Sequence, residues 1–477
     1  MNSHPMRQYW GVTQFETTPS DDAPTDLTRA NAAAASDAAA VARATGQRFD
    51  TRLDRYVDHY AERANALTAS AVRSLFSVAA RPEIVSLAGG MPNIVDLPLN
   101  VVAEAMNSVV MSSGAMAMQY GSGQGEPFMR EHICEVMELE GISAHPDDVV
   151  VTVGSQQALD LVTRIFCDPG DVIMAEAPSY VGALGTFASY QAEIVHVGMD
   201  DQGLRPDALR AGVAAVRAAG KRAKFLYTIP NFNNPSGITQ SLARRRELVE
   251  TCRELDLLIV EDNPYGLLTL DGDPMPAMRS MDAERVIYLG SFSKTFAPGF
   301  RVGWVLAPHA VREKLLLAQE SAVLSPPVFS QYAVSAYLEQ HDWKGQIVAF
   351  RDMYRQRRDA MLDALDEYMP EGTTWTRPGG GFFVWVTLPE GLDSQSMLPR
   401  GISGRVAFVP GTAFYADGFG SSHLRLSYCY PTPANIREGV RRLASVMRQE
   451  LELRDTFGLR GAERKHLDRG VPASDVF

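Results

Sequence analysis

Strands and helices alternate along the chain between residues 147 and 305, and this alternation constrains the fold more than any other feature. Short apolar runs such as Val172–Met174, Lys224–Tyr227 and Leu257–Val260 are separated by stretches with helical spacing such as Leu242–Leu255. Such an alternation predicts a mostly parallel sheet with both faces covered by helices. Ligands bind at the carboxyl ends of parallel strands, so the residues that follow each strand are the candidates for a functional site.

Polar and aromatic residues follow the predicted strands. They include, in chain order, Ser155, Gln156, Tyr180, Asn234, Asp262, Tyr265, Ser291, Ser293 and Lys294. The first two open a helix directly after Gly154, and this strand–glycine–helix join leaves free backbone N–H groups at a helix N-terminus. Such a terminus is a ready anion site. These positions therefore predict a site for an anionic ligand at the carboxyl edge of the sheet.

The stretch Ser291–Arg301 reads S-F-S-K-T-F-A-P-G-F-R and lies between two apolar runs, Val286–Leu289 and Val302–Val305. A lysine in this position is poorly explained as a solvated surface charge. Lysine forms Schiff bases with carbonyl cofactors, and two serines with an arginine suit a phosphate monoester. Taken alone, the stretch is equally compatible with a serine-rich loop that contains an incidental lysine.

The composition argues against several classes of function. The formal net charge of −12 disfavours a nucleic-acid partner, because nucleic-acid-binding surfaces are basic. The four cysteines are scattered and form no C-x-x-C pair, so we expect neither a metal site nor a disulfide framework. No run reaches transmembrane length, and no apolar core follows a basic start. We therefore expect no membrane partner and a cytoplasmic location.

A series of motifs occurs in the order Y-G-S-G-Q-G, G-S-Q-Q, E-A-P-S-Y, N-F-N-N-P-S-G, E-D-N-P-Y, S-F-S-K-T-F-A-P-G-F-R and L-R-L-S. This order resembles the fold-type I pyridoxal 5′-phosphate (PLP) aminotransferases of class I/II, and most of all the branch of 2-aminoadipate and kynurenine aminotransferases. The resemblance covers residues 60–447. It implies an α/β fold with a mostly parallel central sheet in a large domain, a smaller α/β domain, PLP as cofactor, and a homodimer with shared active sites.

The composition and the resemblance together divide the chain. We expect residues 1–50 to be a disordered N-terminal extension, because they are rich in alanine and small polar residues without an amphipathic face. Residues 51–100 are expected to form the N-terminal segment of the small domain, and residues 101–335 the large PLP-binding domain. Residues 336–455 are expected to form the small C-terminal domain, and the charged residues 456–477 a tail.

The resemblance assigns the catalytic roles. Lys294 is implied to carry PLP and to move the substrate α-proton, and Asp262 to keep the pyridine nitrogen protonated. Tyr265 and Asn234 are implied to hydrogen-bond the 3′-oxygen of PLP, and Tyr180 to stack on its ring. Each residue also has an ordinary structural alternative, namely a buried lysine, a helix cap, a turn residue or a core tyrosine.

Further residues are implied to bind the phosphate and the substrate. The implied phosphate ligands are Ser155, Gln156, Ser291, Ser293 and Arg301, together with Tyr120 from the neighbouring subunit. Arg425 is implied to clamp the substrate α-carboxylate bidentately, beside Asn234 and Gly90. The glycine pair that includes Gly90 either lets backbone approach a ligand or forms a plain turn. Arg73, on a predicted helix, is implied to pair with a distal substrate carboxylate; its alternative is a solvated helix residue.

These roles predict a PLP-dependent aminotransferase with a ping-pong mechanism. An L-amino acid of the 2-aminoadipate, aromatic or branched-chain type gives up its amino group, and 2-oxoglutarate then receives it. Two alternatives remain. A PLP-binding transcription regulator would need a basic winged-helix domain ahead of Arg52, where the chain is short, alanine-rich and acidic. Another PLP reaction, such as β-elimination or decarboxylation, would use the same cofactor residues.

Overall fold

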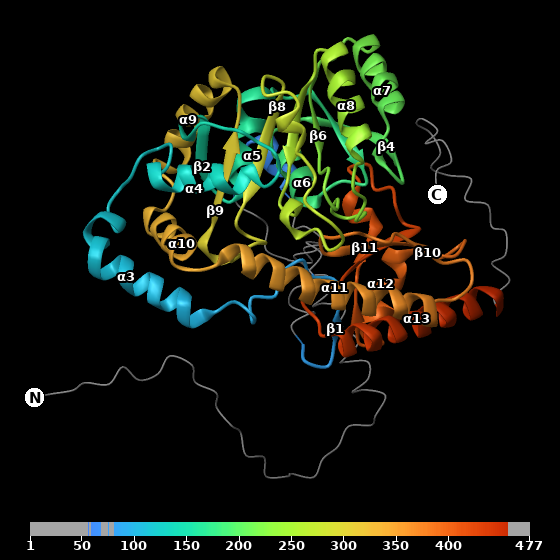
Figure 1. Cartoon of the computed structure of the whole chain (residues 1–477). Helices are drawn as coiled ribbons and strands as arrows, with labels where there is room; N and C mark the ends of the chain where they lie inside the picture. Colours follow the sequence, from blue (N-terminus) through green and yellow to red (C-terminus); the bar gives the residue numbers. More distant parts are fainter. Residues whose placement is uncertain (1–55, 57–58, 68–74, 76–80, 457–477) are drawn as a thin grey trace, which may run out of the picture. The chain divides into compact units, whose positions relative to one another are not determined.

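The computed structural model of the chain describes residues 56, 59–67, 75 and 81–456 (Figure 1). The expected extension of residues 1–50 lies outside the described residues, as do Arg73 and all of the expected tail except Thr456. A helical pattern is predicted between Arg52 and Ala80. Within the described part of that stretch, a 3-10 helix, η2, spans Glu62–Ala66, and Leu75 is helical.

An eight-stranded sheet forms the centre of the described region, in the order β2-β9-β8-β7-β6-β3-β4-β5 (Figure 1). The strands are β2 (Val149–Val153), β3 (Val172–Ala177), β4 (Glu193–Asp200), β5 (Gly203–Leu204), β6 (Ala223–Thr228), β7 (Leu258–Asp262), β8 (Val286–Ser291) and β9 (Val302–Leu306). The neighbours β4, β3, β6, β7 and β8 run parallel. Strand β9 runs antiparallel to β8 and β2, and β5 antiparallel to β4. The predicted α/β class with a mostly parallel central sheet is confirmed.

Helices cover both faces of this sheet because alternate strand residues point to opposite sides. In β3, Ile173 and Ala175 pack in one apolar cluster, whereas Val172 and Met174 pack in another. The first cluster also contains apolar residues of three helices, α5 (Ser155–Phe166), α6 (Val181–Ser189) and α9 (His309–Val323). The second cluster contains apolar residues of α7 (Pro206–Ala218) and α8 (Leu242–Glu254).

Three further helices lie near the β2 edge of the sheet. Helix α10 (Val328–Gln340) packs against α3 (Leu99–Ala117) and α4 (Pro127–Glu138), and α4 also contacts β2. Short 3-10 helices occur in the connections and are η3 (Pro146–Asp148), η4 (Gly266–Leu268), η5 (Met278–Ser280), η6 (Pro298–Phe300) and η7 (Gly411–Phe414). Within the described ranges, no helix has both the length and the apolar character needed to cross a membrane.

A second, antiparallel sheet has the order β10-β11-β14-β13. Its strands are β10 (Thr374–Trp375), β11 (Phe383–Thr387), β13 (Val409–Pro410) and β14 (His423–Ser427). Helices α11 (Trp343–Tyr368) and α13 (Pro433–Thr456) pack side by side next to it, and α12 (Ser394–Ser403) packs on α13 (Figure 1). A parallel pair, β1 (Val85–Ser86) with β12 (Val406–Ala407), joins the segment that begins at Arg81 to this part of the chain.

Candidate active site

The parallel strands bring the predicted residues to one edge of the central sheet. Asp262 is the last residue of β7 and Ser291 the last residue of β8. Tyr180 follows β3 and is the N-cap residue of α6. Burial and the negative charge of Asp262 raise the pKa of Tyr180, while Arg425 and Arg301 oppose this rise, so these three charged residues all lie within electrostatic reach of Tyr180.

Asp262 presents one carboxylate oxygen without a partner. Its Oδ2 accepts a hydrogen bond of 2.7 Å from the Tyr227 hydroxyl, whereas the buried Oδ1 has no hydrogen-bond partner among the described residues. Burial raises the pKa of the Asp262 carboxyl to about 6, and the bond from Tyr227 opposes this rise. A buried polar atom without a partner is uncommon and calls for a ligand. A protonated ring nitrogen would supply the missing donor, so this residue fits PLP.

Tyr227 itself was not among the predicted site residues. The stretch Lys224–Tyr227 predicts a buried strand, and Tyr227 does lie in β6 with its ring packed edge-to-face on Phe187, 5.4 Å between centroids. In the sequence, only the alternation of side chains along the predicted strand indicates that Tyr227 could belong to the site. Tyr227 is the last residue of the predicted strand and lies on the same face as Phe225. A hydroxyl in that buried position needs a polar partner.

Lys294 lies half-buried in the loop after β8. Its Nζ donates a hydrogen bond of 3.0 Å to the Gly90 carbonyl oxygen and lies 5.7 Å from the centroid of the Phe382 ring. Burial lowers the pKa of the Lys294 amine to about 8; Cys429 opposes this shift, and the charge of Arg425 adds to it. An amine that is partly neutral near physiological pH can act as a nucleophile and as a base.

Gly154 and Arg301 form an anion-binding corner at the start of α5. Gly154 has a φ of 76° and offers no side-chain cap, so the first N–H groups of α5 have no side-chain acceptor. The Arg301 guanidinium donates to the Val153 carbonyl at 3.1 Å, and a Cβ on Gly154 would lie 2.3 Å from Arg301 Nη2. A Cβ on Gly303 would lie 2.5 Å from the Ser155 backbone nitrogen. Only glycine keeps this corner open, and a phosphate dianion fits it.

The predicted serine and glutamine ligands differ in availability. The Ser291 hydroxyl donates to the Ser293 hydroxyl at 2.8 Å and accepts the Ser293 N–H at 3.0 Å, so the two serines are hydrogen-bonded to each other. The Gln156 side chain instead turns to α6. It donates to Thr186 Oγ1 at 2.7 Å and accepts from the Tyr180 hydroxyl at 3.4 Å. The backbone N–H of Gln156, rather than its amide, is the group that can face an anion.

Arg425 lies on β14 and is 2% exposed. Its guanidinium lies 4.1 Å from the centroid of the Phe383 ring and 5.0 Å from that of Phe414. It donates to Asn234 Oδ1 at 2.8 Å and to the Ala88 carbonyl at 2.7 Å, while its buried Nε has no partner in the described ranges. Burial lowers its pKa to about 10. A buried guanidinium without a carboxylate partner fits an anionic substrate group.

The remaining predicted residues that the structure describes are Tyr265, Tyr120 and Gly90. Tyr265 is buried, with its ring edge-to-face on Phe382 at 5.3 Å between centroids, and burial raises its pKa. Tyr120 is 78% exposed, in a loop whose Gln124 carbonyl accepts the Val151 N–H. Gly90 leaves room for Phe383, because a Cβ there would lie 3.0 Å from Phe383 Cζ.

In the part of the chain that the structure describes, no cluster of three His, Cys, Asp or Glu residues could hold a metal.

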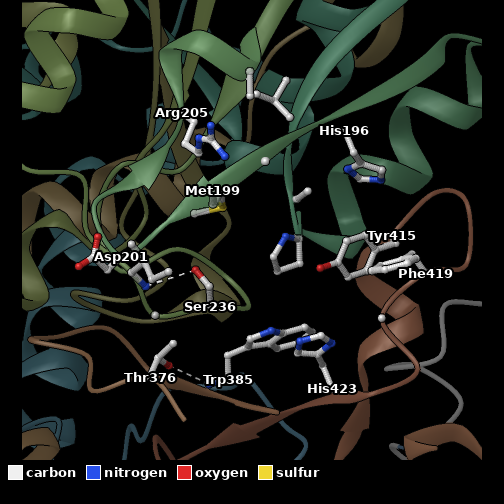
Figure 2. Close-up of a pocket in the computed structure, with 18 of the residues that line it drawn as sticks. His196, Met199, Asp201, Arg205, Ser236, Thr376, Trp385, Tyr415, Phe419 and His423 are labelled. Carbon is white, nitrogen blue, oxygen red and sulfur yellow. Dashed lines mark hydrogen bonds between the residues drawn. The ribbon is translucent and has the colours of Figure 1, made fainter. Parts of the chain in front are cut away.

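A separate cavity of about 2530 Å³ lies between β4 and the second sheet, and none of the predicted site residues that the structure describes lines it (Figure 2). His196, Tyr415, Trp385 and His423 point into it, and the Trp385 and His423 rings stack at 5.4 Å between centroids. Ser236 belongs to the same wall, so the cavity borders the back of the loop that carries Asn234.

Comparison with known proteins agrees with this geometry. The family described as "Aminotransferase class I and II" matches residues 82–443. An aromatic-amino-acid aminotransferase of Thermococcus litoralis is 42% identical over 405 residues, which cover 83% of this chain and 96% of the relative.

Two solved structures are similar over the same region. A kynurenine aminotransferase of Pyrococcus horikoshii has a TM-score of 0.80 and 39% identity, covering 83% of this chain and 99% of its own. An α-aminoadipate aminotransferase of Thermus thermophilus, complexed with N-(5′-phosphopyridoxyl)-L-leucine, has a TM-score of 0.77 and 35% identity, with coverage of 83% and 99%. Proteins named as transcription regulators occur among more distant relatives.

Proposed function

Because the chain belongs to the class I and II aminotransferase family and is a PLP-dependent transaminase of fold type I, we propose that it transfers the amino group of an L-amino acid to 2-oxoglutarate by a ping-pong mechanism. The proposed donors are 2-aminoadipate, aromatic and branched-chain amino acids. The names of the relatives support the first two classes, since they include aromatic-amino-acid and α-aminoadipate aminotransferases.

The unpartnered Oδ1 of Asp262 is the observation that carries this proposal. Bound PLP supplies an electron sink for the electron pair left when the substrate Cα–H bond breaks. Asp262 would keep a proton on the ring nitrogen through Oδ1. The negative charge of this buried carboxylate would make the cofactor an effective electron sink. Lys294 Nζ takes the proton from the substrate Cα, and a pKa of about 8 suits a base that works near neutral pH.

The other site residues bind and orient. The N–H groups of Ser155 and Gln156, the hydroxyls of Ser291 and Ser293 and the guanidinium of Arg301 hold the phosphate. Asn234 and Tyr265 hydrogen-bond the 3′-oxygen, and the Tyr180 ring stacks on the cofactor. Arg425 binds the substrate α-carboxylate, with Gly90 leaving space beside it. The partner for this carboxylate is a guanidinium that already packs on the Phe383 and Phe414 rings, so little ordering is needed on binding.

We also propose that the active unit is a homodimer in which Tyr120 reaches the phosphate of the neighbouring subunit. Helix α3 and the residues after it leave apolar side chains exposed, among them Met111, Met116 and Met118, and Tyr120 follows directly. Exposed apolar patches of this kind mark interaction surfaces. Light scattering at assay concentration tests the proposal, and a fully active monomer would contradict it.

Substrate choice and location complete the proposal. Arg73 pairs with a distal carboxylate, as in 2-aminoadipate or 2-oxoglutarate, and so favours acidic substrates while apolar ones are still accepted. The substitution Arg73→Ala should then raise the Michaelis constant for dicarboxylic donors by about tenfold and leave that for leucine nearly unchanged. The four cysteines are buried and unpaired, which suits a reducing compartment such as the cytoplasm.

One assay decides between transamination and another PLP reaction. Purified protein is incubated with 2-oxoglutarate and a panel of donors that includes 2-aminoadipate, kynurenine, leucine and phenylalanine, and the products are identified by mass spectrometry. The proposal expects equal amounts of glutamate and of the 2-oxo acid that matches the donor. Release of ammonia with loss of a side-chain group, or of carbon dioxide, would instead identify β-elimination or decarboxylation.

A further inference from the structure

Glu176 is a fully buried carboxylate near the end of β3 that the proposed reaction does not use. Four donors converge on it. They are Thr228 Oγ1 at 2.6 Å, the Ile229 N–H at 3.0 Å, Asn233 Nδ2 at 2.6 Å and Gln240 Nε2 at 3.0 Å. Three of these donors belong to the segment of residues 229–240, here called the Asn234 loop. One carboxylate therefore holds both ends and the middle of this loop.

The Asn234 loop carries a contact to the proposed substrate clamp. The Asn233 side chain that donates to Glu176 also accepts the Ser236 N–H at 3.0 Å and the Ser236 hydroxyl at 2.9 Å, which fixes the turn around Asn234. Asn234 Oδ1 in turn accepts from Arg425 Nη1 at 2.8 Å. A continuous path of contacts thus leads from Glu176 through Asn233 and Asn234 to Arg425.

The backbone of Glu176 is tied to the other side of that clamp. Its carbonyl oxygen can only accept, so His196 Nδ1, 3.0 Å away, carries the proton, and His196 Nε2 accepts the Ala416 N–H at 2.9 Å. Figure 2 shows His196 beside Tyr415 at this junction. Two residues earlier, Phe414 lies 5.0 Å from the Arg425 guanidinium. Two of the neighbours of Arg425, Asn234 and Phe414, are therefore linked to Glu176.

Burial raises the pKa of the Glu176 carboxyl to about 7, and the four hydrogen-bond donors oppose this rise because they favour the ionised form. An ionised carboxylate has acceptor sites only, and all four partners are donors. A glutamine of the same shape would turn an NH₂ group toward at least one of these donors and would leave it unpaired in a buried place. Losing one charge-assisted hydrogen bond and leaving a buried donor unpaired changes an equilibrium constant by about ten- to a hundredfold. The side chain is therefore selective for charge as well as for shape.

We propose that Glu176 is a positioning residue for amino-acid binding, in that it holds the Asn234 loop so that Asn234 and Arg425 meet the substrate α-carboxylate in one arrangement. This inference rests on the proposed transaminase function and adds a residue that touches neither substrate nor cofactor.

Glu261 provides a matched control. It is a fully buried glutamate, one residue before the end of β7. It lies on the same row and face of the sheet as Glu176, because Thr228 of β6 pairs with Glu261 and the residue before Thr228 pairs with the residue before Glu176. Its carboxylate accepts the N–H groups of Met278 at 2.9 Å and Arg279 at 2.8 Å, both in η5. These hydrogen-bond donors lie outside the Asn234 loop.

The test compares Glu176→Gln with Glu261→Gln in two measurements. The first is amide hydrogen exchange of residues 229–240 in the protein freed of cofactor. The second is binding of 2-oxoglutarate and the kcat and Michaelis constant for the best amino donor in the cofactor-loaded protein. We expect Glu176→Gln to speed exchange in the loop at least about tenfold and to raise the dissociation and Michaelis constants about ten- to a hundredfold. Glu261→Gln should change these values less than about threefold, even at an equal loss of melting temperature.

Equal effects of the two variants, or unchanged substrate constants in Glu176→Gln, would reduce Glu176 to a structural carboxylate and overturn the inference. If Glu176→Gln does not fold, Asn233→Ala removes the middle tether together with the two hydrogen bonds from Ser236. It should reproduce the faster exchange and the weaker binding; normal behaviour of Asn233→Ala would also overturn the inference. A wild-type protein that fails to transaminate would refute the proposed function, while the exchange comparison would still decide whether Glu176 holds the loop.

Discussion

Asp262 and Lys294, on the proposed cofactor side of the site, follow two neighbouring strands of one sheet, whereas Arg425, on the proposed substrate side, comes from a second sheet and meets Asn234 across 191 positions of the chain. On the cofactor side, the register of parallel strands places the functional groups. On the substrate side, side-chain contacts between separate parts of the fold do so. We therefore expect the substrate side to lose function without loss of cofactor, and the cofactor side to lose both.

The largest effect is expected from Lys294→Ala. Removing the base for the α-proton should lower turnover about 10⁴-fold, and borohydride should no longer fix PLP to the peptide that contains residue 294. Steady-state kinetics and mass spectrometry of the reduced protein measure both effects. Lys344→Ala, on the exposed side of α11, is the control and should behave as wild type. Fixation of PLP to a different lysine would refute the assignment.

The next largest effect is expected from Asp262→Asn. The amide has the same size but cannot hold a proton on the ring nitrogen as an anion does, so turnover should fall at least about a hundredfold. Some PLP should still bind through the phosphate corner, as absorbance after gel filtration would show. Turnover close to that of the wild type would contradict the proposed role of Oδ1.

Arg425→Lys tests the substrate side alone. A lysine keeps the charge but loses the planar, bidentate donor set, so the Michaelis constant for amino donors should rise about ten- to a hundredfold. Retention of PLP during dialysis should equal that of the wild type. If PLP is lost in parallel with substrate affinity, the two sides of the site are not separable and the comparison above fails.

The smallest effect is a shift in pH dependence. In the cofactor-free protein, Asp262 becomes protonated as the pH falls through about 6, so PLP affinity should decrease below that pH and hold above it. The hydrogen bond from Tyr227 lowers this pKa, so Tyr227→Phe should move the midpoint upward by up to about one pH unit. Tyr190→Phe, which removes a similar bond to Asp160, should leave the midpoint in place. A downward or absent shift in Tyr227→Phe would argue against Asp262 as the titrating group.

The same contrast explains what could be predicted from the sequence. The positions of Asp262 and Ser291 follow from apolar runs that end in polar residues, because parallel strands share one carboxyl edge. Arg425 has no such local signal: it is an arginine inside an apolar strand, and its role was inferred from a resemblance. Its contact with Asn234 depends on how the two sheets pack, which no spacing in the sequence expresses.

Two local features also escaped prediction. Helix α12 was not predicted, since it is short and contains Pro399, a residue that disfavours helix interiors. The direction of the Gln156 side chain was not predicted either: it reaches Thr186 on α6. In each case the tertiary partners, rather than the local sequence, determine the outcome.

The short pairing of β1 with β12 has a consequence for synthesis of the protein. Val85 pairs with Val406, so the ribosome must add roughly 320 further residues before β1 can pair with β12. At typical rates of translation this takes about 20 to 60 seconds. Throughout that interval the carbonyl group of Ala88 also lacks the Arg425 donor from which it later accepts. A ribosome stalled near residue 406 would hold a chain with all eight central strands made and the substrate side still missing.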